Sequence, residues 1–474
     1  MTTASQTSGQ KVHFIGICGV AMSAVATALW QKGYTVTGSD AGFFPPVSTH
    51  LTNLGIPYYA GFHPEKMIEG GVPDFVVVGN ATATKNPEFL YVQEHNIPYK
   101  SYPEAMGEFL IQKNSIVVAG TYGKTTSSAL LTHIFRHANL KPSYMIGGLM
   151  QNNLPSAHID TGEWSIVEGD EYSTAKWDKR AKFMHYRPTH LLLTAVKWDH
   201  ADIYPTEEFY FNAFRELLKL LPRNGQVIAC LDTETLPNLL SEADIPFTSY
   251  GKHDKAQYRY GNISQSPKGI EFDIIYHGKI YKIESPMLGM YNAENITGCF
   301  ALAHSIGIAP GDISDAIKTF PGMKRRLEKR YENDVTIIDD IAHSPEKAKS
   351  ILANLKTIYP QSTIITVFEP NTGNRTPQSK PAYGSAFKDA DEIIIPKLTK
   401  LKVDTAHPEK TFEGDELAKT IRESHANVHY IEDDEKLVEY LVHNRKKGDV
   451  IAFLGSHGFR GMIEETIKHL TGHN

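Results

Sequence analysis

Residues of the types needed to bind phosphate lie at positions 116–126, Ile-Val-Val-Ala-Gly-Thr-Tyr-Gly-Lys-Thr-Thr. This run begins as a short apolar strand and continues as a glycine-containing turn that ends in Gly123-Lys124-Thr125. Glycines let backbone N–H groups approach phosphate oxygens, a lysine supplies positive charge, and a threonine hydroxyl can ligate Mg²⁺. The sequence therefore predicts a protein that uses ATP. The residues expected to bind the nucleotide are Gly120, Thr121, Tyr122, Gly123, Lys124, Thr125 and Thr126.

The spacing of this loop differs from the common phosphate-binding pattern, because only two residues separate Gly120 from Gly123. A helix-like run, 125–135, follows the loop, so that phosphates would meet the positive end of a helix dipole. The alternative is an ordinary loop that enters a helix. The strand before the turn and the helix after it favour nucleotide binding.

Acidic residues follow two further strand-like runs. Glu168 opens the segment Glu-Gly-Asp-Glu, which ends at Glu171, and His200 lies in Trp-Asp-His-Ala-Asp, residues 198–202. Carboxylate and hydroxyl oxygens suit a hard cation, so we expect Thr125 and Glu168 to ligate Mg²⁺. Taken alone, His200 would be interpreted as a solvated loop histidine. Because Glu168 and Thr125 also lie at the ends of neighbouring strands, His200 is a candidate third ligand.

A second glycine turn, Gly16-Ile17-Cys18-Gly19, lies near the start of the chain between a strand-like and a helix-like run. Such a turn is typical of dinucleotide binding, and it tolerates alanine at the third glycine position, which mainly controls helix–strand packing. Ser39 and Asp40 end the next strand, and Asp40 suits a ribose hydroxyl or a uracil edge. NAD, another nucleotide, or a tight turn without a ligand all remain open for this motif.

A third acidic group lies in the C-terminal part of the chain, where Asp339 and Asp340 end a strand-like run. His343 follows, and Ser344-Pro345 is typical of a helix start. Helix capping does not account for two adjacent carboxylates and a histidine, although a solvated loop remains the alternative.

Length, charge and cysteine count restrict the class of protein. A chain of 474 residues is expected to hold about three domains. A formal charge of −6 gives no support for a nucleic-acid surface. Three widely spaced cysteines predict reduced thiols rather than disulfides, and no apolar run reaches the roughly 20 residues that span a bilayer. We expect a cytoplasmic enzyme with no membrane insertion and no nucleic-acid partner.

Alternating strand-like and helix-like runs favour a parallel α/β architecture. We expect domains at 1–110, 111–322 and 323–474. Residues 97–104 are interpreted as the run-out of the first domain. In the second domain, 271–283 alternates apolar and polar residues around His277-Gly278, which predicts an antiparallel hairpin attached to the parallel sheet.

Taken together, these motifs resemble the Mur ligase family, the ATP-dependent amide-forming enzymes of bacterial peptidoglycan synthesis. The resemblance covers nearly the whole chain and rests on segments 120–126, 168–171 and 199–202. It implies a Rossmann-like UDP-binding domain, a central P-loop ATPase domain with a small antiparallel appendage, and a Rossmann-like C-terminal domain that binds the amine substrate. It also implies that Asn292 and Asn295 lie on the adenine side.

Within this family the chain is most similar to the peptidoglycan-recycling branch, at segments 16–19, 45–49, 178–188 and 200–204. The implied substrates are UDP-N-acetylmuramate and the tripeptide L-Ala-γ-D-Glu-meso-diaminopimelate, with L-alanine as the alternative acceptor. The chain departs from the family at Tyr291, where a histidine is usual, and segment 368–375 follows the branch only in part. Residues 201–218 contain no lysine, so no carbamylated lysine is expected.

The resemblance implies that ATP converts the sugar's carboxylate to an acyl phosphate, which the acceptor amine then attacks. It implies closure of the C-terminal domain over the nucleotide. A nicotinamide oxidoreductase would leave the phosphate loop without a role, and a non-catalytic nucleotide-binding regulator would not need the metal ligands. The implied catalytic residues are Lys124, Glu168, His200, Arg326, Asp340 and His343, of which Arg326 and Asp340 also contact the nucleotide. The implied metal ligands are Thr125, Glu168 and His200, and the implied UDP-sugar contacts are Gly16, Ile17, Cys18, Gly19, Ser39 and Asp40.

Overall fold

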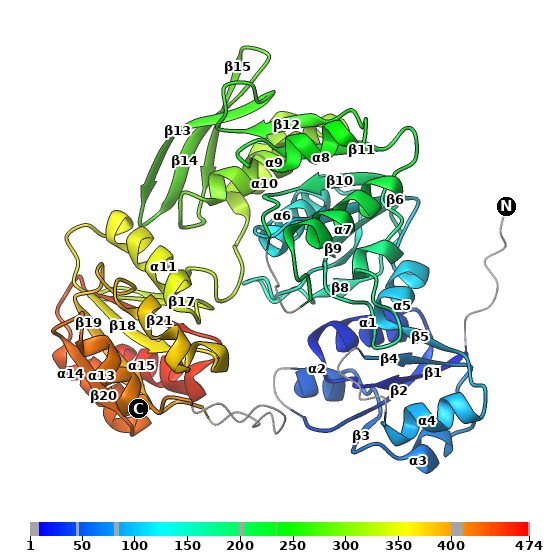
Figure 1. Ribbon diagram of the computed structural model, residues 1–474, viewed down its shortest axis with the longest axis horizontal. Helices are drawn as coiled ribbons and strands as arrows, with labels where there is room; N and C mark the ends of the chain where they lie inside the picture. Colours follow the sequence, from blue (N-terminus) through cyan, green and yellow to red (C-terminus); the bar gives the residue numbers. More distant parts are fainter. Residues whose placement is uncertain are drawn as a thin grey trace. The chain divides into compact units, whose positions relative to one another are not determined.

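The computed structural model describes residues 9–43, 47–79, 85–198, 203–233, 235–399 and 411–472 (Figure 1). The chain forms two compact units. The first comprises Met1–Asn262, Phe272–Ser285 and Ala293–Pro321, and the second comprises Ile263–Glu271, Pro286–Asn292 and Gly322–Asn474. Three β-sheets with flanking helices confirm the expected three-domain α/β architecture. Within the described ranges, none of the helices combines the length and the apolar character that crossing a bilayer requires.

The N-terminal sheet is a parallel five-stranded sheet with the order β3-β2-β1-β4-β5. Its apolar strands β1 and β4 lie at the centre, and helices connect successive strands. Its strands are β1 (Lys11–Ile15), β2 (Thr35–Asp40), β3 (Tyr58–Ala60), β4 (Phe75–Val78) and β5 (Tyr99–Ser101), and its helices are α1 (Val20–Gln31), α2 (Val47–Asn53), α3 (Pro64–Ile68), α4 (Pro87–Glu94) and α5 (Tyr102–Phe109).

The interpretation of residues 97–104 as the run-out of the first domain is wrong, because this segment contains β5 and the start of α5. Ser101 ends the strand and caps the helix: its Oγ accepts from the backbone N–H of Glu104, whose carboxylate accepts from Ser101 N in return. This capping box satisfies free N–H groups of the first turn and fixes where the helix starts.

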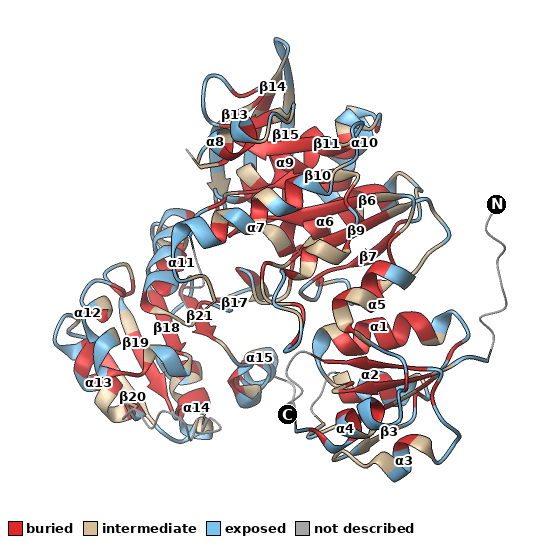
Figure 2. Ribbon diagram, turned by 45° about the vertical axis from the view of Figure 1, so that its right-hand side comes forward, coloured by how far each residue is buried: buried red, intermediate tan, exposed pale blue. Residues whose placement is uncertain are grey.

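The middle sheet has ten strands in the order β15-β14-β13-β12-β11-β10-β6-β9-β7-β8. Figure 2 shows that its central strands β6, β9, β10 and β11 are largely buried, as their continuous apolar runs predict. The strands are β6 (Asn114–Ala119), β7 (Ser143–Met145), β8 (Ala157–His158), β9 (Trp164–Gly169), β10 (His190–Leu193), β11 (Gln226–Cys230), β12 (Thr248–Gly251), β13 (Tyr258–Ser266), β14 (Gly269–Tyr276) and β15 (Lys279–Ser285). The helices are α6 (Lys124–His137), η1 (Lys182–His185), α7 (Glu207–Lys219), α8 (Thr235–Glu242), α9 (Asn292–Ser305) and α10 (Pro310–Thr319).

The expected hairpin is present, because the neighbouring strands β14 and β15 are joined by His277 and Gly278 alone. Both residues have positive φ, 47° and 76°. Positive φ at both central residues is the geometry of a type I′ turn, which matches the twist of paired strands.

The C-terminal sheet has six strands in the order β16-β17-β21-β18-β19-β20, and only β16 is antiparallel to its neighbour. Helices α11, α12 and α13 bury side chains in one apolar core, while α14 and α15 bury theirs in a second core on the opposite face. The strands are β16 (Glu328–Glu332), β17 (Thr336–Asp340), β18 (Ile364–Glu369), β19 (Glu392–Pro396), β20 (Val428–Ile431) and β21 (Val450–Gly455), and the helices are α11 (Pro345–Ile358), η2 (Thr372–Asn374), η3 (Pro377–Ser379), α12 (Lys380–Tyr383), α13 (Gly414–Arg422), α14 (Asp434–Asn444), η4 (Phe459–Gly461) and α15 (Met462–Thr471).

Candidate functional site

The predicted phosphate loop joins the carboxyl end of β6 to the first residue of α6, Lys124. Gly120 and Gly123 have φ of 139° and 82°, conformations that L-residues rarely adopt. A side chain at Gly120 would clash with Thr194, and one at Gly123 would clash with Asn295. Both glycines are therefore required by backbone conformation and by close packing. The contact with Asn295 also places the N-terminal part of α9 against the loop.

Thr125 and Glu168 lie together at the carboxyl ends of the paired strands β6 and β9. The Thr125 hydroxyl donates to Glu168 Oε1 at 3.0 Å, and Gly147 N donates to Glu168 Oε2 at 2.9 Å. Burial raises the pKa of Glu168, and these hydrogen bonds together with the nearby Lys124 charge oppose that shift. A hydroxyl and a carboxylate in contact form a set of oxygen donors that suits Mg²⁺.

The acidic segment Glu168–Glu171 distributes its three carboxylates among different partners. Lys124 Nζ lies 2.9 Å from Glu171 Oε2, and Lys182 Nζ lies 2.6 Å from Asp170 Oδ2. Within the described part of the chain, neither a lysine nor an arginine forms an ion pair with Glu168. Glu168 is thus the carboxylate whose charge is left for an added cation. His200, the third predicted ligand, lies outside the described residues.

The N-terminal glycine turn is held by the end of β2. Ser39 O accepts from Gly16 N and Ile17 N at 2.8 and 3.1 Å, and Asp40 Oδ2 accepts from Cys18 N at 2.8 Å. Burial, and secondarily the Asp40 charge, raises the pKa of the Cys18 thiol to about 11. The structure thus brings together the turn, Ser39 and Asp40, which are all of the predicted UDP-sugar contacts.

Sequence reasoning missed the residue that anchors this group, Glu88 at the start of α4. Its buried carboxylate accepts from Ser39 Oγ at 2.5 Å, Tyr59 Oη at 2.6 Å and His63 N at 2.7 Å, and His13 Nε2 lies 3.7 Å away. Burial alone would raise the pKa of Glu88, but the nearby His13 and the hydrogen bonds from Ser39 and Tyr59 outweigh it and lower the pKa. No local pattern predicts contacts between residues this far apart in the sequence.

In the second unit, Asp339 and Asp340 end β17 and are buried, which rules out the solvated-loop alternative. Burial raises the pKa of Asp340 to about 6, although Leu327 N, Ala342 N and the Arg326 charge oppose the shift. His343 follows in the same loop, and burial lowers its pKa. Asp340, Arg326 and His343 therefore share the carboxyl end of β17.

The N-terminus of α9 carries the two predicted adenine-side asparagines. Asn292 Nδ2 donates to Leu288 O at 2.8 Å, and Asn295 packs against Gly123. The preceding Tyr291 is 43% exposed and lies within the electrostatic reach of Asp340 and Arg326.

A cluster that the sequence did not indicate lies where β18 and β21 end side by side. Glu369 pairs in register with Gly455, and a side chain at Gly455 would clash with Glu369 and Phe459. The buried Glu369 carboxylate lies 3.5 Å from Arg375 Nη2 and 3.4 Å from Arg460 Nη1. Arg375 Nη2 is buried and has no hydrogen-bond partner among the described residues. Such an unsatisfied buried group calls for an explanation, and a bound water, an ion or a ligand can supply the missing partner.

The carboxyl ends of β18 and β21 lie at a topological switch point of the sheet. The chain leaves β18 toward α12 on one face and leaves β21 toward α15 on the opposite face. Adjacent parallel strands whose connections diverge in this way leave a crevice at their carboxyl ends, where ligands of open α/β sheets bind.

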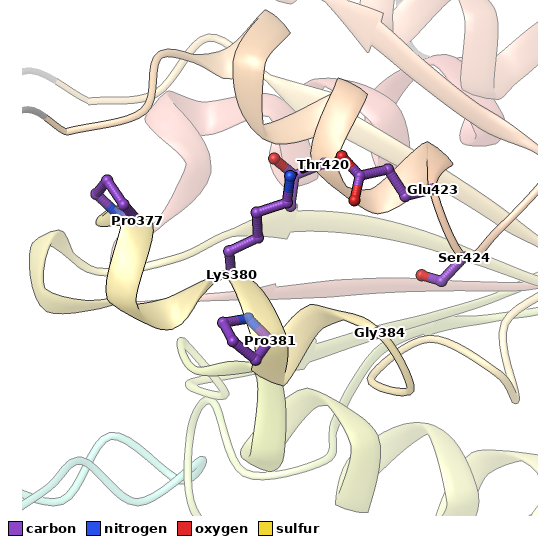
Figure 3. A pocket seen from close by; sticks show the side chains of 7 residues that line it. All are labelled: Pro377, Lys380, Pro381, Gly384, Thr420, Glu423 and Ser424. Carbon is purple, nitrogen blue, oxygen red and sulfur yellow. Dashed lines mark hydrogen bonds and ion pairs between the residues drawn. The ribbon is translucent and has the colours of Figure 1, made fainter.

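We assign no function to two other features of the structure, a cluster of possible metal ligands and a surface pocket. Cys230, Asp232 and Glu294 place ligand atoms within 4.8 Å of one another, but Asp232 already accepts from Lys252 N, His253 N and Tyr260 Oη. A pocket of about 360 Å³ on the second unit is lined by none of the predicted site residues (Figure 3). The Lys380 side chain in that pocket is bound to Glu423 at 2.7 Å.

Comparison with known proteins gives matches along the whole chain. Three family models match: "Mur ligase family, catalytic domain" over residues 11–114, "Mur ligase middle domain" over 118–303, and "Mur ligase, glutamate ligase domain" over 325–457. A UDP-N-acetylmuramate–L-alanyl-γ-D-glutamyl-meso-2,6-diaminoheptandioate ligase from Escherichia coli K12 is 31% identical over 465 residues, which are 97% of this chain and 98% of that protein.

Two further matches concern a different acceptor. A UDP-N-acetylmuramate–L-alanine ligase from Desulfosudis oleivorans is 30% identical over 450 residues, covering 94% of this chain and 95% of that protein. The crystal structure of a UDP-N-acetylmuramate–alanine ligase from Thermotoga maritima superposes with a TM-score of 0.80 at 23% identity, covering 98% of this chain and 100% of that one. At this identity the structural likeness supports the fold alone.

Proposed function

We propose a reaction for this chain from one premise: the chain belongs to the Mur ligase family, whose members are ATP-dependent ligases of peptidoglycan synthesis that form carbon–nitrogen bonds. The proposed reaction joins UDP-N-acetylmuramate to the tripeptide L-Ala-γ-D-Glu-meso-diaminopimelate through an acyl phosphate. The observation that carries it is the contact between Thr125 and Glu168 beside Lys124, at the carboxyl ends of β6 and β9.

The proposed reaction must overcome electrostatic repulsion, because the anionic carboxylate of the sugar has to approach the anionic triphosphate. We propose that Lys124 binds the terminal phosphates, and that Thr125, Glu168 and His200 hold Mg²⁺. The cation would neutralise part of the charge on the phosphoryl group. The protein's own contribution is the loop backbone, because Gly120 and Gly123 permit a positive-φ conformation in which backbone amides can approach phosphate oxygens.

We propose roles for the remaining predicted residues according to the sheet that carries each of them. The turn Gly16–Gly19 with Ser39 and Asp40 would bind the UDP group, and Asn292 and Asn295 would bind adenine. Arg326, Asp340 and His343 would act on the nucleotide from the second unit. We retain the proposed domain limits of 1–110 for the UDP-sugar domain, 111–322 for the ATP-binding domain and 323–474 for the acceptor domain.

The C-terminal sheet supplies the proposed acceptor site. At the proposed crevice between β18 and β21, Glu369 and Arg375 are buried and paired with each other, while the partly exposed Arg460 could bind a carboxylate of the acceptor. The tripeptide carries several carboxylates beyond the reacting amine, whereas L-alanine carries one. Support for the peptide also comes from segment 178–188 and from the E. coli relative, which acts on that peptide by its name.

The acceptor is tested by measuring phosphate release with ATP, Mg²⁺ and UDP-N-acetylmuramate in the presence of either the tripeptide or L-alanine. We expect release to depend on the tripeptide, with a kcat/KM at least about tenfold above that for L-alanine, since each lost charged contact costs 1.4 kcal/mol or more. Mass spectrometry of the nucleotide product identifies the bond formed. A preference for L-alanine would instead assign the reaction of the D. oleivorans relative.

A further inference from the structure

The lysine of the phosphate loop is fully engaged before any nucleotide binds. Lys124 Nζ donates to Gly120 O at 2.6 Å and to Glu171 Oε2 and Oε1 at 2.9 and 3.1 Å. A lysine ammonium has three donors, and these three contacts use them. The Lys124 side chain is 13% exposed and that of Glu171 is 1% exposed, so water screens this ion pair little.

Glu171 is held firmly in its place beside the loop. Tyr204 Oη donates to the backbone oxygen of Glu171 at 2.5 Å, and Tyr210 Oη lies 3.5 Å from Glu171 Oε1. The buried Tyr210 hydroxyl also lies 3.0 Å from Thr121 Oγ1 in the loop itself. These contacts restrain the Glu171 backbone and one oxygen of its carboxylate, so Lys124 moves away from Glu171 when it turns toward a ligand.

A nucleotide phosphate and Glu171 must therefore compete for the same ammonium. When Lys124 turns a donor toward phosphate, it weakens its contact with a buried carboxylate, and a buried charge that loses its partner costs free energy. The Glu171 charge also repels the incoming phosphate. Both effects lower the affinity for a nucleoside diphosphate.

We propose that Glu171 is a positioning residue that holds Lys124 through their ion pair and, by competing with the β-phosphate, weakens ADP binding so that the product leaves. The inference rests on the proposed function in one respect, that Lys124 binds nucleotide phosphate. The ion pair thereby holds the Lys124 side chain in one position, at the expense of nucleotide affinity.

The acidic segment itself offers a matched control. Asp170 is the neighbouring residue and carries the same charge, but its carboxylate pairs with Lys182 at 2.6 Å and not with Lys124. Asp170→Asn and Glu171→Gln each remove one negative charge from the same strand end. Only Glu171→Gln removes the competitor for Lys124.

The experiment measures ADP binding with Mg²⁺ by calorimetry for the full-length wild type, Glu171→Gln, Glu171→Asp and Asp170→Asn, with thermal unfolding to verify folding. We expect Glu171→Gln to bind ADP about five- to tenfold more tightly, and the inhibition constant of ADP to fall by the same factor in steady-state assays. We expect Asp170→Asn to change ADP affinity clearly less, because the Asp170 carboxylate is bound to Lys182 and makes no direct contact with Lys124. Glu171→Asp keeps the charge but lengthens the contact, so a smaller gain is expected.

A merely structural role predicts the opposite sign, because a damaged loop binds ADP less well. Unchanged or weaker ADP binding by folded Glu171→Gln overturns the inference, as does an equal gain in Asp170→Asn. Should Glu171→Gln not fold, the absence of any gain in Glu171→Asp overturns it. A wild type that binds ADP but releases no phosphate with any acceptor contradicts the proposed ligase reaction instead, and leaves the role of Glu171 standing.

Discussion

The three carboxylates of segment 168–171 are equivalent by residue type but differ in their partners. Asp170 and Glu171 each neutralise a lysine, whereas Glu168 contacts the Thr125 hydroxyl and a backbone amide. A metal ion that displaced a lysine would leave an uncompensated ammonium, while one bound to Glu168 adds the missing positive charge. This difference favours Glu168 over Glu171 as the metal ligand.

Glu168→Ala is accordingly expected to raise the Mg²⁺ concentration needed for half-maximal phosphate release by about tenfold or more, since a lost carboxylate ligand weakens metal affinity by at least that factor. The measurement is a Mg²⁺ titration at saturating ATP, with Asp170→Asn as the control for removal of nearby charge. An unchanged titration curve in Glu168→Ala would move the metal site to another carboxylate.

At the residue scale, the sequence predicts chemistry where types and spacing are local. Gly120–Thr126, Glu168 and Asp340 could be identified because each lies directly after a strand-like run. The partner of Lys124 could not be identified, because Glu171 is 47 residues away and reaches it only through strand pairing. Glu88 and Arg375 were missed for the same reason, since their contacts form across the fold.

At the scale of elements, long apolar runs were predicted closely, and short elements were missed. The sequence predicts strands at 75–78 and 226–230 and a helix at 345–358, and β4, β11 and α11 have these limits, because each combines an apolar pattern with clear ends. The three-residue strands β3, β5 and β7 are held by hydrogen bonds to neighbouring strands, and three residues carry no readable period. No sequence pattern predicted the conformation of the loop after β21, in which Phe459 and Arg460 have positive φ.

That loop contains Phe459 and Arg460, which both have φ of 51°. A positive φ is unfavourable for residues other than glycine, so the position of Arg460 is maintained at a conformational cost. Arg460 donates to Asp434 and Thr399 and approaches Glu369. A strained arginine over the crevice between β18 and β21 is consistent with the proposed acceptor site.

Arg460→Gly removes the guanidinium while relieving this backbone cost, so the fold is expected to tolerate the change. We expect KM for the tripeptide to rise about tenfold, in keeping with the loss of a charge-assisted hydrogen bond. The KM values for ATP and UDP-N-acetylmuramate should stay as in the wild type. Steady-state kinetics with each substrate varied in turn provide the measurement.

A control for this variant lies at the opposite edge of the same sheet. Lys356 pairs with Asp391 just before β19, at the amino ends of the strands. Lys356→Ala removes one positive charge from the same sheet without reaching the crevice. An equal rise in the tripeptide KM in both variants, or none in Arg460→Gly, would exclude the crevice as the acceptor site.

At the scale of the whole molecule, the chain carries three sheets, each with its predicted residues at carboxyl strand ends. Alternating strand-like and helix-like runs predicted this series of α/β domains, because each run must bury one face against a neighbour. The chain length led us to expect about three domains, but nothing in the sequence predicted the assignment of 263–271 and 286–292 to the second unit. The unit to which such a segment belongs is decided by its tertiary contacts, which no local sequence pattern predicts.

The proposed contacts to ATP belong to the middle sheet and the proposed contacts to the UDP group to the N-terminal sheet. We therefore expect a change at Lys124 to affect ATP chemistry and not UDP-sugar binding. The residue lies on α6 of the middle sheet, while the turn Gly16–Gly19 with Asp40 belongs to the N-terminal sheet and is stabilised by its own hydrogen bonds. Lys124→Ala should therefore reduce ADP release by about 10³-fold, because it removes a charge that stabilises the transferred phosphoryl group. Affinity for UDP-N-acetylmuramate, measured by calorimetry, should stay within a factor of about two, because the proposed contacts to the UDP group belong to a different sheet and share no hydrogen bond with Lys124. Near-normal turnover in this variant would show that phosphate is activated elsewhere, whereas loss of both functions would show that the two sheets do not act separately.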